Sequence, residues 1–169
     1  TMINEDGTAE LLVGFGDVGA LDQHTVTIDW GDGTTPTEET LVVGAREIFR
    51  THQYLDDLPG ENDEYTITVT VTDDDGGSDS GEIGVTVQND PPNILFIDPV
   101  TMINEDGTAE LLVGFGDVGA LDQHTVTIDW GDGTTPTEET LVVGAREIFR
   151  THQYLDDLPG ENDEYTITV

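Results

Sequence analysis

Short stretches of this chain alternate strictly between apolar and polar residues. In the stretch TVTIDW, Val26, Ile28 and Trp30 share one face, while Thr25, Thr27 and Asp29 lie on the other. A period of two is typical of a strand with one buried face. The stretch therefore predicts a half-buried strand that ends at a core tryptophan.

The same alternation recurs along the chain and predicts further strands. The residues expected to face inward from them are Leu11, Val13 and Phe15; Tyr65, Ile67, Val69 and Val71; and Ile83, Val85 and Val87. REIFRTHQY predicts a shorter, less regular strand, and ILFID and TMI together predict a first strand that is broken at Pro99. The pairs Asp32-Gly33 and Asp75-Gly76 predict tight turns, where glycine supplies a positive φ. About seven short strands per unit, joined by such turns and without a helical stretch, predict an all-β, antiparallel, immunoglobulin-like sandwich.

The chain contains a verbatim repeat, because Thr1–Val69 and Thr101–Val169 are identical at every position. A period near one hundred suits a whole small domain of about 100–150 residues. Pro91 and Pro92 cannot lie in a central strand, so the seam is expected near residues 88–93. This frame predicts one repeat over residues 1–90, without its opening strand segment, and a second over 91–169, without its final strand. We expect the chain to be a window on a longer tandem array.

Charge narrows the choice of partners. The chain has 37 acidic residues, only four basic ones and a formal net charge of −33. Nucleic acid is excluded as a ligand because its binding depends on Lys and Arg, and anionic membrane surfaces are disfavoured. Such charge destabilises a compact state, so divalent cations or high salt should offset it. The chain has no cysteine, so no disulfide contributes, and it contains no apolar run of about 18 residues that would span a membrane.

Three motifs in order, TIDWGDGT, THQY and PGENDEYTITVTVTDDDGG, resemble the polycystic-kidney-disease (PKD) domain. The chain departs from that family by lacking the usual aromatic residue before the GDG turn and by inserting ENDE after Pro59-Gly60. The resemblance implies β-sandwich modules of secreted or cell-surface prokaryotic proteins, which serve as spacers or contact surfaces and carry no catalytic residues. A weaker resemblance links VQNDPPNI to the linkers of cadherin-like, calcium-bridged arrays.

Immunoglobulin-like topology would gather acidic loops of both repeats at their seam. The candidate Ca²⁺ ligands there are Glu5, Asp6, Asp56, Asp57, Asn89, Asp90, Asp117 and Asp122. Ca²⁺ takes about six to eight oxygen ligands in loose geometry, so this supply is adequate. The alternative is that these loops are merely solvated, as most acidic loops are.

Other polar and aromatic residues are interpreted as structural. The two histidines of a repeat, His24 and His52, lack a zinc-ligand spacing. Asp32 is expected to form its turn, and Trp30 to lie in the core rather than stack on a sugar. Arg46 and Arg50 are expected to pair with neighbouring acids, which stabilises a surface only slightly.

These observations predict a non-catalytic extracellular structural repeat: a rigid, calcium-stiffened spacer of a surface adhesin or a filament-forming fibre. Its expected partners are identical repeats, head to tail, with lateral self-assembly into fibres as a further mode. One alternative is a carbohydrate- or protein-binding accessory module of a secreted enzyme, which predicts an exposed row of aromatic residues. Another is a cation sponge or halophile surface component, in which seam geometry has no role.

Overall fold

The computed structural model describes residues 1–55, 62–98, 102–104, 106–155 and 164–169. The described residues form strands and turns, with no helix among them, which confirms the predicted all-β class. They fold into two compact units, Thr1–Asp90 and Pro91–Val169. In the described parts of the chain, no helix is long and apolar enough to cross a membrane.

The first unit contains a five-stranded sheet, which runs in the order β1-β7-β6-β3-β4. Its strands are β1 (Met2–Asn4), β7 (Ser78–Gln88), β6 (Asn62–Asp73), β3 (His24–Asp29) and β4 (Thr37–Thr40). All neighbours are antiparallel except β1, which runs parallel to the end of β7. The antiparallel prediction is therefore corrected at this one short strand.

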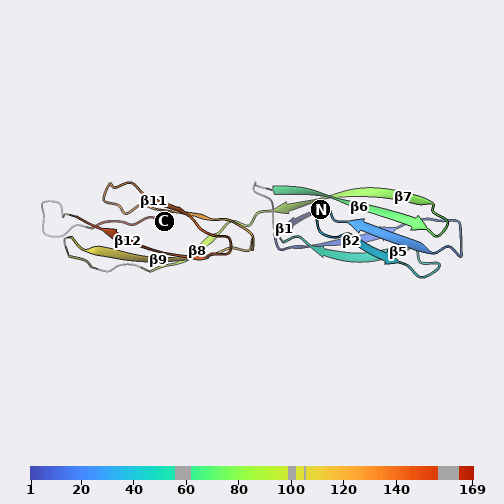
Figure 1. Ribbon diagram of the computed structural model, residues 1–169, viewed down its shortest axis with the longest axis horizontal. Helices are drawn as coiled ribbons and strands as arrows, with labels where there is room; N and C mark the ends of the chain where they lie inside the picture. Colours follow the sequence, from blue (N-terminus) through green and yellow to red (C-terminus); the bar gives the residue numbers. More distant parts are fainter. Residues whose placement is uncertain (56–61, 99–101, 105, 156–163) are drawn as a thin grey trace. The chain divides into compact units, whose positions relative to one another are not determined.

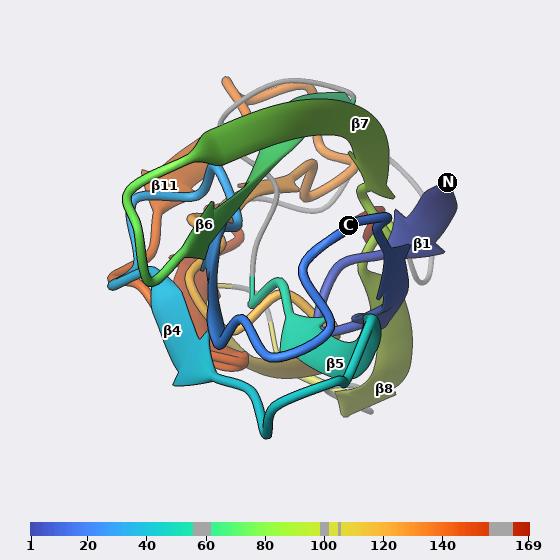
Figure 2. The ribbon, with the colours of Figure 1, turned by 90° about the vertical axis from the view of Figure 1, so that its right-hand side faces the viewer.

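A second sheet of this unit pairs β2 (Thr8–Gly14) with β5 (Glu47–Gln53), antiparallel. The two sheets form the layers of a sandwich, with β6 and β7 on one side and β2 and β5 on the other (Figure 1). Figure 2 looks along the unit and shows β7 and β5 on opposite sides.

The core between these layers includes many of the residues that alternation placed inward. Val26, Ile28 and Trp30 are almost completely buried, with at most 1% of their surface exposed. Ile67, Val69, Val85 and Val87 join them in the same cluster. Ile83 is an exception to the prediction, because 46% of its surface is exposed.

Glycines shape the turns that were predicted from Asp-Gly pairs. Gly33 and Gly76 have φ of 80° and 89°, in the left-handed region that glycine favours. Gly31 has φ of 80° as well, and a Cβ there would lie 2.4 Å from the backbone oxygen of Thr66. Gly31 thus permits the close approach of the β3 end to β6.

The second unit has a three-stranded sheet in the order β12-β9-β8 and a two-stranded sheet of β10 and β11. The strands are β8 (Asn93–Asp98), β9 (Thr108–Gly116), β10 (Thr125–Ile128), β11 (Thr137–Thr140) and β12 (Glu147–Gln153). Ile128, Trp130 and Leu111 lie in its core, as their counterparts do in the first unit. An isolated bridge joins Asp129 to Thr168.

Candidate metal centre

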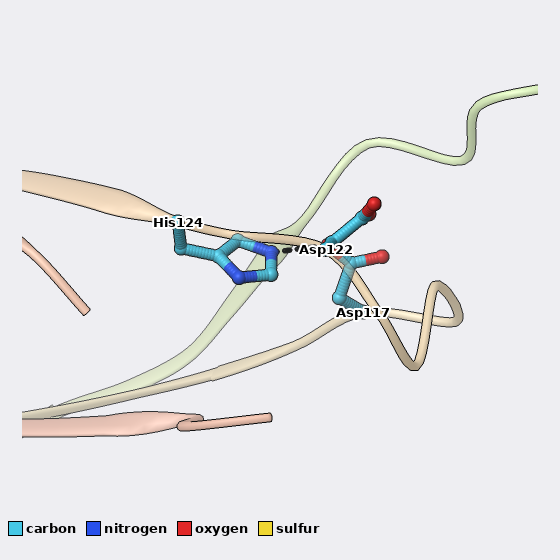
Figure 3. Close-up of side chains that lie close together, drawn as sticks. All are labelled: Asp117, Asp122 and His124. Carbon is cyan, nitrogen blue, oxygen red and sulfur yellow. Dashed lines mark hydrogen bonds and ion pairs between the residues drawn. The ribbon is translucent and has the colours of Figure 1, made fainter. Parts of the chain in front are cut away.

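The loop between β9 and β10 brings two of the predicted ligands together with a histidine. Asp117, Asp122 and His124 each offer one potential ligand atom, and these atoms lie within 4.8 Å of one another (Figure 3). They meet because β9 ends at Gly116 and β10 begins at Thr125, so the connecting loop turns back over the strand ends. The sequence predicted the two aspartates and gave the histidine no role.

The hydrogen bonds of the equivalent histidine in the first unit indicate its tautomer. His24 Nε2 lies 2.8 Å from Asp17 Oδ2, and Nδ1 lies 3.3 Å from Arg46 Nη1. A guanidinium group can only donate, so Nδ1 must accept. Nε2 therefore carries the proton and donates it to the Asp17 carboxylate.

His124 has the same partners, with Nε2 bonded to Asp117 and Nδ1 lying 3.3 Å from Arg146 Nη1. Both ring nitrogens are thus engaged in hydrogen bonds within the protein. A cation at this loop would bind through carboxylate oxygens instead. Such hard donors suit Ca²⁺ or Mg²⁺ better than Zn²⁺.

Arg46 binds the equivalent loop of the first unit, which follows β2. Its Nη2 donates to Gly19 O at 2.6 Å, its Nη1 donates to Ala45 O at 2.9 Å, and its guanidinium lies 5.9 Å from the Phe15 ring centroid. The prediction that Arg46 pairs with an acid was wrong for the described part of the chain, where its partners are carbonyl oxygens and His24.

The prediction for Arg50 was right. Arg50 forms an ion pair with Glu39, and about a third of each side chain is exposed. Because such surface pairs contribute about 0–1 kcal/mol, this contact has little influence on the site.

Negative charge accumulates around Asp22, at the end of the first unit where the loop after β2 meets the β6–β7 turn. Desolvation raises the pKa of Asp22, and the nearby charges of Asp17, Asp74 and Asp75 raise it further. Asp74 Oδ1 also accepts a hydrogen bond from Gln23 N at 3.2 Å, which places the β6–β7 turn beside this loop.

Asp17 has the opposite shift. The backbone N–H of Gly19 lowers the pKa of Asp17, and His24 lowers it further. The fold thus stabilises the charged form of Asp17 and disfavours the charged form of Asp22. A cation near Asp22 would relieve the repulsion that Asp22 experiences.

Of the remaining predicted ligands, those that the structure describes lie at the opposite end of the first unit from the loop after β2. Glu5 is 2% exposed, and its Oε1 accepts a hydrogen bond from Asp90 N at 2.8 Å. Asp6 adopts φ of 58°, and its Oδ1 accepts from Gln53 Nε2 at 2.7 Å. Asn89 is exposed.

Glu5 therefore ties the turn after β1 to the backbone beyond β7, while Asp6 ties the same turn to the end of β5. Asp56 and Asp57 lie outside the described residues. That these groups share an ion with Asp117 and Asp122 stays a prediction.

The aromatic residues of the motifs form a separate structural network. The His52 ring stacks on Trp30 with centroids 4.7 Å apart, and its Nε2 lies 2.7 Å from Asp32 Oδ2. Tyr54 donates its hydroxyl proton to Trp30 O at 2.8 Å, and burial together with the charge of Asp32 raises the pKa of Tyr54 to about 12. His52, Asp32 and Trp30 thus have the structural places that their sequence positions predicted.

No protein-family model and no curated protein matches this chain.

Proposed function

We propose that this chain is a non-catalytic structural repeat of an extracellular filament or surface adhesin of the PKD type. In this proposal its sandwich units act as rigid spacers, and Ca²⁺ bound at their acidic ends stiffens the array. The observation that carries it is the letter-for-letter repetition of Thr1–Val69 as Thr101–Val169. Repetition in series adds length and valency, whereas it adds little to a single catalytic site.

The charge distribution supports a role for calcium. The carboxylates of Asp17, Asp74 and Asp75 all act to raise the pKa of Asp22 at one end of the first unit. A chain with a net charge of −33 and a repulsive cluster of this kind is stabilised by a divalent cation that binds the folded state.

The placement of the aromatic rings supports a spacer rather than a sugar-binding module. Trp30, Tyr54 and their counterparts Trp130 and Tyr154 are buried in the two cores. A sugar-binding face requires aromatic rings at the surface. Because these four rings are buried, they cannot contact a sugar.

Thermal unfolding of the chain with Ca²⁺ and with a chelator tests the proposal. We expect Ca²⁺ to raise the melting temperature at concentrations far below those at which potassium chloride does so by screening. A ligand at one hundred times its dissociation constant stabilises by about 2.7 kcal/mol. Identical melting curves with Ca²⁺ and chelator would refute the calcium part of the proposal.

A double variant tests whether Ca²⁺ binds at Asp22 and Asp122. Asp22→Asn with Asp122→Asn should abolish the calcium response, whereas Glu38→Gln with Glu138→Gln removes the same charge from exposed positions on β4 and β11 and should preserve it. In chelator, the Asp22 substitution should itself raise the melting temperature. The reason is that the raised pKa of Asp22 reflects a charged form that the fold disfavours.

A further inference from the structure

β5 and its counterpart β12 leave the same sheet edge open in both copies. In the described residues, β5 pairs only with β2, and β12 pairs only with β9. Phe49 and Phe149, in the middle of these strands, are both 52% exposed. The two copies have different neighbours along the chain, because β6 and β7 follow β5, whereas β8 precedes β9. An edge that is open in both therefore belongs to the repeat itself.

The hydrogen-bond pattern shows which backbone groups of β5 face the open side. Phe15 N donates to Arg46 O, so these two residues form a hydrogen-bonded pair. Bonded and non-bonded pairs alternate along an antiparallel ladder, so Phe49, three residues after Arg46, belongs to a non-bonded pair. Its N–H and C=O therefore point away from β2, toward the open side. The corresponding bond in the second unit gives Phe149 the same orientation.

An arginine covers this outward-facing carbonyl in both copies. Arg50 Nη1 donates to Phe49 O at 2.6 Å. Arg150 Nη1 donates to Phe149 O at 2.5 Å. The guanidinium of Arg50 also forms an ion pair with Glu39, and its counterpart does the same in the second unit. Because Glu39 lies on β4, the last strand of the other sheet, the arginine connects the edges of the two layers.

Stability alone gives little reason for this contact. About a third of the Arg50 and Glu39 side chains is exposed, and exposed ion pairs stabilise a fold only slightly. The chain nevertheless has only four basic residues, and each copy uses one of its two in this way, with the same partners. What the guanidinium does is to cover an acceptor that a strand of another chain would need for pairing.

The two edges on this side of the sandwich differ in how well charge protects them. β4 has only four residues, two of which are glutamates, and short, charged edge strands resist pairing. β5 has seven residues, including Ile48 and Phe49, and its charged residues Glu47 and Arg50 cancel each other. The net charge of −33 therefore protects β5 less than it protects β4.

We propose that Arg50 and Arg150 keep the β5 and β12 edges closed to strands of other copies of the chain. An open edge with apolar residues is a template for pairing between chains. Every copy of the repeat has the same edge, so open edges would pair at several places at once and gain avidity. Neither calcium nor the spacer role enters this proposal, so failure of either would leave it standing.

A labelled peptide tests the edge directly. Fluorescein-labelled Glu47–Gln53, of sequence EIFRTHQ, should bind the variant Arg50→Gln, Arg150→Gln at least about tenfold more tightly than the unaltered chain, which corresponds to about 1.4 kcal/mol. Fluorescence anisotropy measures both affinities. A strand that adds to a sheet edge binds through its backbone, so the same peptide with Phe49→Pro should not bind. Equal affinity of EIFRTHQ for the variant and the unaltered chain would overturn the proposal.

Charge and edge opening predict opposite results for association between chains. Loss of Arg50 and Arg150 makes the chain more negative, and repulsion should then reduce association, whereas an open edge should increase it. Adding Glu47→Gln and Glu147→Gln restores the net charge of the unaltered chain. In sedimentation velocity, this charge-matched variant should associate, and Glu47→Gln with Glu147→Gln alone should not. A charge-matched variant that associates no more than the unaltered chain would refute the proposal.

A further variant separates the covered carbonyl from the ion pair. Glu39→Gln with Glu139→Gln removes the ion pair but keeps the arginine that donates to the edge carbonyl. This variant should bind EIFRTHQ less tightly than Arg50→Gln, Arg150→Gln does. Equal affinities of the two variants would assign the effect to the ion pair and contradict the proposal.

Hydrogen exchange distinguishes strand pairing from a loss of stability. Added EIFRTHQ should slow the exchange of amides in β5 and β12 of Arg50→Gln, Arg150→Gln, whereas local unfolding would accelerate it. Mass spectrometry of the peptic peptides that cover these strands measures the rates. Arg50→Met with Arg150→Met keeps the packing of an aliphatic stem and should respond in the same way, which keeps the test decisive where the glutamines prevent folding. Unchanged exchange at β5 and β12 with saturating peptide would show that the edge is not the binding site.

Discussion

At the scale of residues, a histidine holds the acidic loop of each unit in place, because its imidazole bonds to an aspartate on one side and an arginine on the other. His24 donates to Asp17 and accepts from Arg46, and His124 repeats this arrangement with Asp117 and Arg146. These bonds join the loop after β2 to the residue before β5. The histidine is therefore a positioning residue for the aspartates of the candidate metal centre.

His24→Phe should destabilise the first unit, because it removes the two hydrogen bonds that the buried imidazole makes with Asp17 and Arg46. The phenyl ring retains the packing against Phe15, whose centroid lies 4.9 Å from that of His24. Urea unfolding measures the loss, and His124→Phe should reproduce it in the second unit. An unchanged unfolding midpoint would show that the two bonds contribute nothing.

Acid should destabilise the chain through Asp132. The Thr134 hydroxyl and then His152 lower the pKa of Asp132 to about 2. The pKa of Asp32 is also lowered: burial acts to raise it, but bonds from Thr34 and His52 outweigh burial. A group whose pKa is lower in the folded state stabilises above its unfolded pKa of about 3.9, and this stabilisation is lost as the pH falls toward 2.

Asp132→Asn should therefore flatten the dependence of unfolding free energy on pH between about 4 and 2. The measurement is a series of urea titrations across this range, with Glu138→Gln as the control. Equal slopes for Asp132→Asn and the unaltered chain would contradict the assignment.

At the scale of elements, alternation predicted the inward faces of β3 and β6 because a buried face imposes a period of two on the sequence. It missed the exposure of Ile83, because alternation identifies a face but does not show whether other elements pack against it. The aspartates of the candidate centre were predictable from loop topology. His124 was missed because its role depends on Arg146, which lies on a different part of the fold.

Gly31 and Gly33 separate two reasons for glycine in one turn. Both have φ of 80°, but only at Gly31 would a Cβ meet a backbone oxygen, that of Thr66. Gly33→Ala should cost about 1–2 kcal/mol from the left-handed conformation alone. Gly31→Ala should cost clearly more, and thermal unfolding of the two variants measures the difference. Equal losses would show that β6 moves aside freely.

At the scale of the whole molecule, the chain shows what the same sequence does in two settings. Among the described residues, β6 and β7 pair in the first unit, and β9 pairs with both β12 and β8 in the second. Sequence alone predicted that each copy would miss one strand segment. The same frame gave the opening segment to the second repeat, but the register of β8 on β9 required the structure.

Calcium should also restrict the motion between units if it binds at their seam. Small-angle X-ray scattering of the chain should then give a narrower distance distribution with Ca²⁺ than with chelator. The Asp22→Asn, Asp122→Asn variant should behave as the chelated chain does. Indistinguishable scattering profiles with Ca²⁺ and with chelator would contradict the prediction that metal stiffens the seam.

The verbatim repeat has a consequence for folding. β2 and β9 have the same residues at equivalent positions and pair with β5 and β12 in the same register. A partly folded chain can therefore pair a strand with the corresponding partner from the other copy, because the residues on the two partners do not distinguish a correct pairing from an exchanged one.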